Sequence, residues 1–376
     1  MPDNVCSRAV PHDNRAGTRV QNGPPGDDPP PIGGVSPRPL SVGGSGGPGI
    51  AGGQSSPRVV SVGSLLDSIR EDLYSGKRPV QYAVANEPWG SIALRPGDVI
   101  GIAGPPGKGK TALSMQLVVD ALRLHEGVNA LVVNVEMSPE RLFERQVSRL
   151  SGVAFADIAD RMILGPQVEQ IERALSTLEM LKERLFFMRE PFNIETIARS
   201  LIEIKPHILL VDYVQRIEYG NGTLDARARL NAVMSETRRI ASAGIAVMIV
   251  SAVGRTNSKR DGGYSSRELG LGSFRESSEL EYGVDDAFIF TDAGSGSAKA
   301  SGGPRVMKLR HVKSRNHLQK DVTLEFDGAV QQFRLLGDHK EHKKPAKEQR
   351  KPPAASGSNP PVNDRWAQDF LGDGLL

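Results

Sequence analysis

The most informative part of this chain is Asp98-Val-Ile-Gly-Ile-Ala-Gly104-Pro-Pro-Gly107-Lys108-Gly109-Lys110-Thr111. Its last eight residues fit the phosphate-binding pattern G-x-x-x-x-G-K-[S/T], with an apolar run before them and a helical pattern after them. Glycines let backbone N–H groups close around phosphates, and the following helix adds the positive end of its dipole. The stretch therefore predicts a nucleotide-phosphate site, the alternative being a chance turn rich in Gly and Pro. The predicted contacts are Gly104, Pro105, Pro106, Gly107, Lys108, Gly109, Lys110 and Thr111.

The side chains near this loop predict ATP and Mg²⁺ as its ligands. Lys110 would neutralise the β- and γ-phosphates, and the Thr111 hydroxyl would bind Mg²⁺. Asp212 follows the apolar run from Ile208 to Val211, and α/β sheets place ligand groups at the carboxyl ends of their strands. We therefore predict that Asp212 is the second residue that holds the metal; an ordinary Asp at a strand-to-loop turn is the alternative.

Hydrolysis also requires a group that orients or deprotonates water. Glu136 ends the apolar run from Ala130 to Val135, which places it at the same sheet edge as the phosphate loop. An acid at this point is typical of RecA-like ATPases and not of nucleotide kinases. We predict Glu136 as the catalytic base; a surface residue before a helix that starts at Ser138 is the alternative.

Apolar runs and helical patterns alternate along the middle of the chain, which predicts an α/β fold of the RecA-like P-loop type with a largely parallel twisted sheet. Continuous apolar runs, as in strands buried on both faces, are Val99 to Ala103, Ala130 to Val135, Ile208 to Val211 and Ile245 to Ser251. Helical periodicity is found at Thr111 to Glu126, Pro139 to Ser151, Val168 to Arg184 and Leu224 to Ser242. Four later runs predict an antiparallel extension of the sheet: Ala287 to Phe290, Arg305 to Val312, Val322 to Phe326 and Gln331 to Leu335.

Composition predicts one folded domain between two disordered ends. More than half of the residues from Asn22 to Gly53 are Gly or Pro, and such a segment cannot bury enough apolar surface to offset the entropy of ordering. The predicted organisation is a disordered arm at 1–57, a linker helix and lead-in segment at 58–94, a RecA-like domain at 95–337 and a disordered tail at 338–376.

Charge and cysteine content exclude several classes of protein. The formal net charge of +3 permits nucleic-acid binding without indicating it. Cys6 is the only cysteine, which excludes disulfides within the chain and cysteine-based zinc sites. No apolar run reaches the length of a membrane span and the N-terminus has no signal-peptide core, so we expect a cytoplasmic protein without a membrane partner.

Five motifs between Gly104 and Asn316 resemble, in the same order, the C-terminal motor domain of DnaB-type replicative DNA helicases of superfamily 4. The phosphate loop is the first. The others are Asn134-Val-Glu-Met-Ser138, similar to S-L-E-M-S; Val211-Asp-Tyr-Val-Gln215, similar to I-D-Y-L-Q; Phe274-Arg-Glu-Ser-Ser-Glu-Leu-Glu281, similar to L-R-E-S-G-x-I-E; and Lys313-Ser-Arg-Asn316, similar to K-x-R-N. The resemblance implies a RecA-like ATPase that works as a homo-oligomeric ring, a hexamer, on single-stranded DNA.

The resemblance also implies roles for three cations. Arg145 stands where the family carries an arginine near the phosphates. Lys313 and Arg315 match cations that reach the γ-phosphate bound by the neighbouring subunit, as an arginine finger does. A solvated basic strand is the alternative for these two residues.

A second group of residues resembles the loop that grips single-stranded DNA in the channel of the ring. The polar, Gly-rich stretch before it, from Gly254 to Gly272, is basic and predicts an electrostatic track for the phosphates of the strand. An exposed flexible loop is the alternative. The predicted DNA contacts are Arg275, Glu276, Ser278, Lys259 and Arg260.

Two further segments are predicted to bind protein partners. An amphipathic helix from Ser64 to Tyr74, with Ser64 as its N-cap, stands where the family has a linker helix that docks on the adjacent subunit; packing on its own domain is the alternative. The tail from Asn363 to Leu376 combines apolar residues with aspartates, like a docking motif for a replication protein. A frayed terminus is the alternative for the tail.

The chain departs from the family pattern at three points, and these keep three functions open. The family's N-terminal collar domain is expected to be absent, Ser278 replaces a usual glycine, and Ala252 replaces the glutamine that senses the γ-phosphate. The leading hypothesis is an ATP-driven ring translocase and DNA helicase. A RecA-like regulatory or loading ATPase, favoured by Ala252, is the second, and a P-loop kinase is the third.

Overall fold

The computed structural model describes residues 59–85, 89, 92–220, 222–252, 282–292 and 303–336. The predicted arm (1–57) and tail (338–376) lie outside these residues. The chain divides into two units after Tyr74, so helix α1 and the remainder are described separately. Among the described residues, no helix combines the length and the hydropathy that crossing a membrane would require.

Helix α1 (Val62–Tyr74) is amphipathic and has no buried residue. The prediction of Ser64 as its N-cap is wrong. The Ser61 hydroxyl accepts a hydrogen bond from the Ser64 N–H (3.2 Å), which is the usual capping contact, so the helix begins earlier than predicted. The apolar face carries the exposed side chains Leu65 (43%), Leu66 (52%), Ile69 (50%) and Leu73 (72%).

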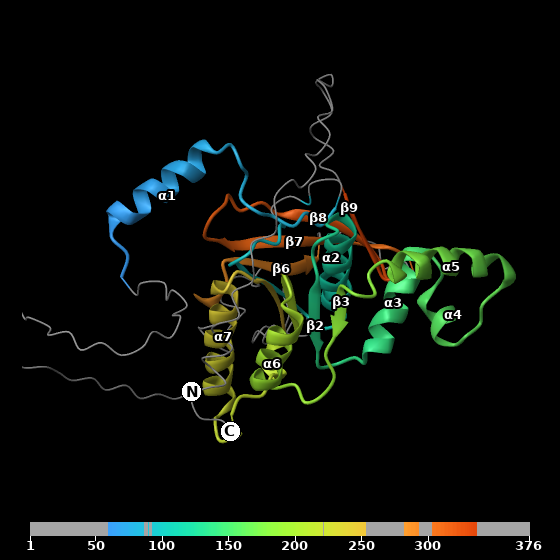
Figure 1. Ribbon diagram of the computed structural model, residues 1–376. Coiled ribbons are helices and arrows are strands. Elements are labelled where there is room, and N and C mark those ends of the chain that lie inside the picture. Colours follow the sequence, from blue (N-terminus) through green and yellow to red (C-terminus); the bar gives the residue numbers. More distant parts are fainter. Residues whose placement is uncertain are drawn as a thin grey trace, which may run out of the picture. The chain divides into compact units, whose positions relative to one another are not determined.

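The second unit is built on one mixed sheet with the strand order β3-β2-β4-β5-β1-β6-β7-β8-β9 (Figure 1). The pairs from β3 to β6 are parallel, and those from β6 to β9 are antiparallel. The sheet confirms the predicted RecA-like fold class. The strands are β1 (Val99–Gly104), β2 (Ala130–Asn134), β3 (Leu185–Phe187), β4 (Ile208–Asp212), β5 (Ala246–Ala252), β6 (Asp286–Asp292), β7 (Arg305–Ser314), β8 (Val322–Asp327) and β9 (Gln332–Leu335).

Strand β6 corrects one detail of the prediction. Its apolar run was expected to open the antiparallel extension, but β6 pairs parallel with β1, with Asp286 opposite Ile100. Residues Ala287 to Phe290 are fully buried, as in a strand that is covered on both faces. The antiparallel extension therefore begins one strand later, at β7.

Helices cover both faces of the sheet (Figure 1). On one face α2, α3 and α5 form a core with Ile100 and Ile102 of β1. On the other face α6 and α7 pack with Val99 and Ala103, because successive side chains of a strand point to opposite faces. The helices are α2 (Lys110–Leu124), α3 (Pro139–Ser151), α4 (Phe155–Ala159), α5 (Gly165–Glu179), α6 (Ile194–Ile204) and α7 (Ala226–Ser242), with a 3₁₀ helix η1 (Val214–Arg216).

The sequence prediction missed β3, α4 and α6, and placed the helix α5 too far along the chain. The helix was expected to reach Arg184 but ends at Glu179, and the chain then joins the sheet edge as β3 beside β2. Helix α6 begins after Asn193, whose side chain accepts a hydrogen bond from the Thr196 N–H (2.8 Å) and so caps it.

Candidate functional site

The predicted phosphate loop lies between β1 and α2. Helix α2 begins at Lys110, and its N-cap Gly109 has φ 82°, a left-handed conformation that favours glycine. The Lys110 Nζ donates hydrogen bonds to the carbonyl oxygens of Gly104 (2.8 Å) and Pro105 (3.1 Å). The amine is thereby held over the loop, within the turn that would surround a phosphate.

Aromatic residues of the antiparallel strands support this loop. A Cβ atom at Gly109 would lie 2.9 Å from Phe333 Cζ and 3.2 Å from Phe326 Cε1, and these two rings stack with their centroids 4.3 Å apart. The Gln116 side chain of α2 donates to the Phe333 carbonyl (2.9 Å) and accepts from the Phe333 N–H (2.8 Å). The extension of the sheet therefore fixes the first turns of α2.

Asp212 and Asn134 end neighbouring strands directly beside the loop. They are partners in the β2–β4 register, and the Asn134 Nδ2 donates a hydrogen bond to the Asp212 Oδ2 (3.0 Å). Burial raises the pKa of the Asp212 carboxyl to about 6; a hydrogen bond from Thr111 lowers it, and the charge of Glu136 raises it. The structure thus brings together Thr111, Asp212 and Glu136, which are far apart in the sequence.

Glu136 is positioned by a turn that Asn134 organises. The Asn134 Oδ1 accepts hydrogen bonds from the N–H groups of Glu136 (3.0 Å) and Met137 (2.8 Å), a local turn typical of Asn. Burial lowers the pKa of Lys110, while the charges of Asp212 and Glu136 oppose this effect. The sequence prediction missed Asn134 as a site residue, although an Asn two positions before an acid at a strand end is the signal that would find it.

Arg145 approaches the same site from α3. Burial lowers the pKa of its guanidinium, the charge of Arg141 lowers it further, and the charge of Asp212 raises it. Within the described part of the chain, its buried Nε–H has no hydrogen-bond partner, and its guanidinium lies over the Phe155 ring, 5.4 Å from the centroid. A buried N–H without a partner is costly, so this group suits an anionic ligand.

The donor set matches a magnesium ion that is shared with phosphates. The described residues contain no cluster of three or more His, Cys, Asp or Glu side chains that could hold a metal alone. Mg²⁺ is usually bound through one or two carboxylates, substrate phosphates and water. The hydrogen-bonded pair Thr111 and Asp212, beside the phosphate loop, fits that arrangement.

Lys313 and Arg315 lie near the amino ends of the parallel strands β6 and β1, whereas the phosphate loop follows the carboxyl end of β1. Ser314 is opposite Asp286 in the register of β6 and β7, and Asp286 is opposite Ile100 at the start of β1. Strand β1 then continues to Gly104, roughly 13 Å further at about 3.3 Å per residue. The structure therefore does not bring these two cations to the loop of their own chain.

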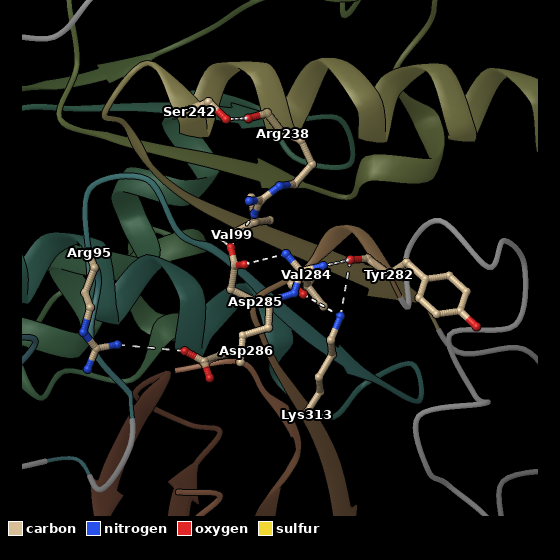
Figure 2. A network of polar contacts seen from close by, with 10 residues as sticks. Arg95, Val99, Arg238, Ser242, Tyr282, Val284, Asp285, Asp286 and Lys313 are labelled. Carbon is tan, nitrogen blue, oxygen red and sulfur yellow. Dashed lines mark hydrogen bonds and ion pairs between the residues drawn. The ribbon is translucent and has the colours of Figure 1, made fainter. Parts of the chain in front are cut away.

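Both side chains are held there by contacts of their own. The Lys313 Nζ donates hydrogen bonds to the carbonyl oxygens of Val284 (2.7 Å) and Tyr282 (3.3 Å) (Figure 2). The Arg315 Nη1 donates to the Asp285 Oδ1 (3.0 Å) and its Nη2 to the Tyr282 carbonyl (2.6 Å). The predicted DNA contacts lie outside the described residues; they are Lys259, Arg260, Arg275, Glu276 and Ser278.

Comparison with known families settles the relationship. The model of the DnaB-like helicase C-terminal domain matches residues 91–335. The chain belongs to this family. A DnaB-like domain is a helicase-type ATPase domain that uses a bound nucleotide, which speaks against the P-loop kinase hypothesis.

Two solved structures share the fold of this DnaB-like domain. One, described as an ATPase domain, superimposes with a TM-score of 0.59 at 16% identity, covering 74% of this chain and 99% of that one. A DnaB-like replicative helicase, described together with its interactions with primase, superimposes with a TM-score of 0.59 at 15% identity, covering 73% of this chain and 68% of that one. No curated protein matches the chain significantly.

Proposed function

We propose that the chain is an ATP-driven DNA translocase that assembles as a ring, a hexamer by its family resemblance, around single-stranded DNA. The observation that carries the proposal is the position of Arg315. Asp285 holds this residue near the amino ends of β1 and β6, whereas the phosphate loop of the same chain follows the carboxyl end of β1. Because Arg315 lies away from the loop of its own chain, we infer that it acts on a nucleotide that another copy of the chain binds and that ATP is hydrolysed between subunits.

Each residue beside the phosphate loop has its own role in binding or hydrolysing ATP. Lys110 exchanges its carbonyl partners for oxygens of the β- and γ-phosphates, and Thr111 and Asp212 hold Mg²⁺. When bound, this ion neutralises charge that develops on the phosphates. Glu136 accepts a proton from the attacking water, and Arg145 donates its unpartnered N–H to a phosphate oxygen.

The neighbouring subunit completes the site with Lys313 and Arg315. An arginine finger stabilises the charge of the transition state and typically contributes about 10³- to 10⁵-fold in rate. Within one chain the Asp285 carboxylate already compensates part of this cationic charge. We expect binding of nucleotide to require one subunit and its hydrolysis to require two.

The ring and the DNA track complete the proposal. Helix α1, whose apolar residues are exposed, docks on the adjacent subunit and closes the ring. The basic residues Lys259, Arg260 and Arg275 bind phosphates of the strand in the channel, and Glu276 and the Ser278 backbone belong to the same DNA-binding segment. The tail docks a replication partner.

An ATPase assay with and without single-stranded DNA, run beside a mass measurement in Mg²⁺ and nucleotide, tests this function. We expect a ring-sized oligomer whose turnover rises with DNA. DNA affinity should fall with salt at a log–log slope of about −0.7 per phosphate contacted, and Arg275→Ala should weaken binding to all sequences alike. A chain that stays monomeric and hydrolyses ATP at full speed would refute the proposal.

A regulatory or loading ATPase is the second candidate, and Ala252 is the observation that favours it. Ala252 lies opposite Gly104 in the β1–β5 register, next to the loop, yet its side chain has no hydrogen-bonding group. In the residue before it, the Ser251 hydroxyl accepts a hydrogen bond from the Gln215 side-chain amide (2.7 Å). If DNA binds without stimulating turnover, nucleotide-controlled partner binding replaces translocation as the function.

A further inference from the structure

Asp285 is a buried carboxylate just before β6 that holds groups from three other parts of the fold (Figure 2). Its Oδ2 accepts hydrogen bonds from the Val99 N–H at the start of β1 (2.8 Å) and from Arg238 of α7. Its Oδ1 accepts a hydrogen bond from the Arg315 Nη1 (3.0 Å). One side chain thus connects the first strand, the last helix before β5 and the end of β7.

Arg315 is fixed by Asp285 at both its backbone and its side chain. The Arg315 N–H donates to the Asp285 carbonyl (3.0 Å), and its guanidinium donates to the Asp285 carboxylate and the Tyr282 carbonyl. A guanidinium has five N–H donors, and two are used in these contacts. The side chain remains 45% exposed, so donors are left for an external anion.

The Asp285 carboxylate is itself held by other residues. The backbone N–H of Asp285 donates to the Val99 carbonyl (2.8 Å) while Val99 donates back to the carboxylate, so the residue is fixed on β1. Arg238 approaches from the α7 side and fixes the second oxygen. The Asp285 Oδ1 can therefore hold the Arg315 guanidinium in one orientation without moving itself. Supporting contacts of this kind fix the geometry of catalytic groups.

We propose that Asp285 is the positioning residue of the trans-acting arginine: it orients the Arg315 guanidinium toward the phosphates of a nucleotide bound by the neighbouring copy. This inference rests on the proposed function, because it requires a site that two copies share. Arg238 supports Arg315 indirectly, by holding the Asp285 carboxylate. A displacement of about 1 Å can cost on the order of 100-fold in rate, so loss of Asp285 lowers turnover and leaves nucleotide binding intact.

The test compares Asp285→Asn with Arg315→Ala in the full chain. We expect Asp285→Asn to reduce kcat by up to about 100-fold, with the Kd for a fluorescent ATP analogue close to that of the wild type. The melting temperature should fall, because Asp285 is buried and pairs with Arg238 and Arg315, so kcat and Kd are compared at a temperature where the variant is folded. The double variant should be no slower than Arg315→Ala alone, because the two residues act as one unit. Asp321→Asn is the matched control, since Asp321 pairs with another cation, Lys308 of β7 (2.8 Å), and should keep kcat.

Mixing with Lys110→Ala separates a positioning role from a structural one. Lys110→Ala subunits lack the phosphate cradle but keep an ordered Arg315, so mixed rings should recover turnover at the loops of Asp285→Asn subunits. No recovery means that Asp285 supports the fold of its own site, and this overturns the inference. If Asp285→Asn does not fold, Arg238→Gln decides in its place: it should lower kcat in the wild-type background and have no effect beside Arg315→Ala.

Two results separate the shared site from the positioning role of Asp285. Full turnover in Arg315→Ala would remove the shared site and the proposed function with it. Full turnover in Asp285→Asn, with Arg315→Ala inactive, would remove only the positioning role.

Discussion

Replacing Asp212 with Asn should stabilise the nucleotide-free protein while abolishing hydrolysis. Asp212 is 2% exposed, and burial raises its pKa from 3.8 to about 6. At about 1.4 kcal/mol per pKa unit, the ionised form costs the folded state about 3 kcal/mol at neutral pH. An Asn of the same shape avoids that cost and can keep the contact with Asn134 through its amide oxygen, so we expect a gain of about 1–3 kcal/mol in the free energy of unfolding.

The sign of the pH dependence follows from the same shift. The unfolded chain releases the Asp212 proton near pH 3.8 and the folded chain near pH 6. Stability from this group therefore falls as the pH rises from about 4 to 6, and the cost is constant above that range. The advantage of Asp212→Asn should be full at pH 8, smaller at pH 5.5 and smallest near pH 4.

Thermal unfolding without nucleotide, at pH 8 and pH 5.5, measures this difference. A domain of this size shifts its Tm by about 2–4 °C per kcal/mol, so a rise of several degrees is expected at pH 8. Asp120→Asn is the control of opposite sign, because Asp120 pairs with the buried Arg149 (3.0 Å) and its loss should destabilise the protein. In Mg²⁺ and ATP the wild type should gain stability and Asp212→Asn should gain less. If Asp212→Asn melts below the wild type at pH 8, the ionised Asp212 carboxylate does not destabilise the folded protein.

Three further variants are predicted. Gly109→Ala should lower stability by more than Gly152→Ala, because both have positive φ but only the first Cβ meets an aromatic ring (2.9 Å); equal melting temperatures would contradict this. Burial lowers the pKa of His125, so below about pH 6.5 the unfolded chain binds the proton more readily than the folded chain, and the folded state loses stability. In urea unfolding, His125→Gln should therefore lose less stability than the wild type between pH 7.5 and 5.5. Equal losses of unfolding free energy in the two proteins would contradict this. Asn134→Ala should reduce kcat by about 10- to 100-fold, as for groups that orient metal-holding residues, while an unchanged kcat would deny it a role.

The local parts of the site could be predicted from the sequence, since the phosphate loop and the strand-ending acids carry their signals within a few residues. Asp212 and Glu136 follow apolar runs, and parallel strands bring such ends to one edge. Asn134 was missed because the prediction considered charged groups and did not ask what orders the turn before Glu136.

The pairings between distant residues could not be predicted. Asp285 and Arg315 are 30 residues apart, and no spacing rule connects a strand start with the end of the next strand. The direction of β6 depends on a long connection from β5, so its apolar run fitted either a parallel or an antiparallel neighbour. Strand β3 has only three residues, all partly exposed, and carries too little pattern to separate it from the end of α5.

The most direct measurement for the shared site mixes two variants that are inactive alone, Lys110→Ala and Arg315→Ala. Each would lack one half of the proposed shared site, and random mixing in a ring would pair an intact loop with an intact arginine at about a quarter of the interfaces. If the site is shared between subunits, equal amounts of the two variants, mixed and allowed to exchange subunits, should regain up to about a quarter of the wild-type ATPase rate. A mixture that stays as inactive as its components, although it forms mixed oligomers, would contradict a shared site.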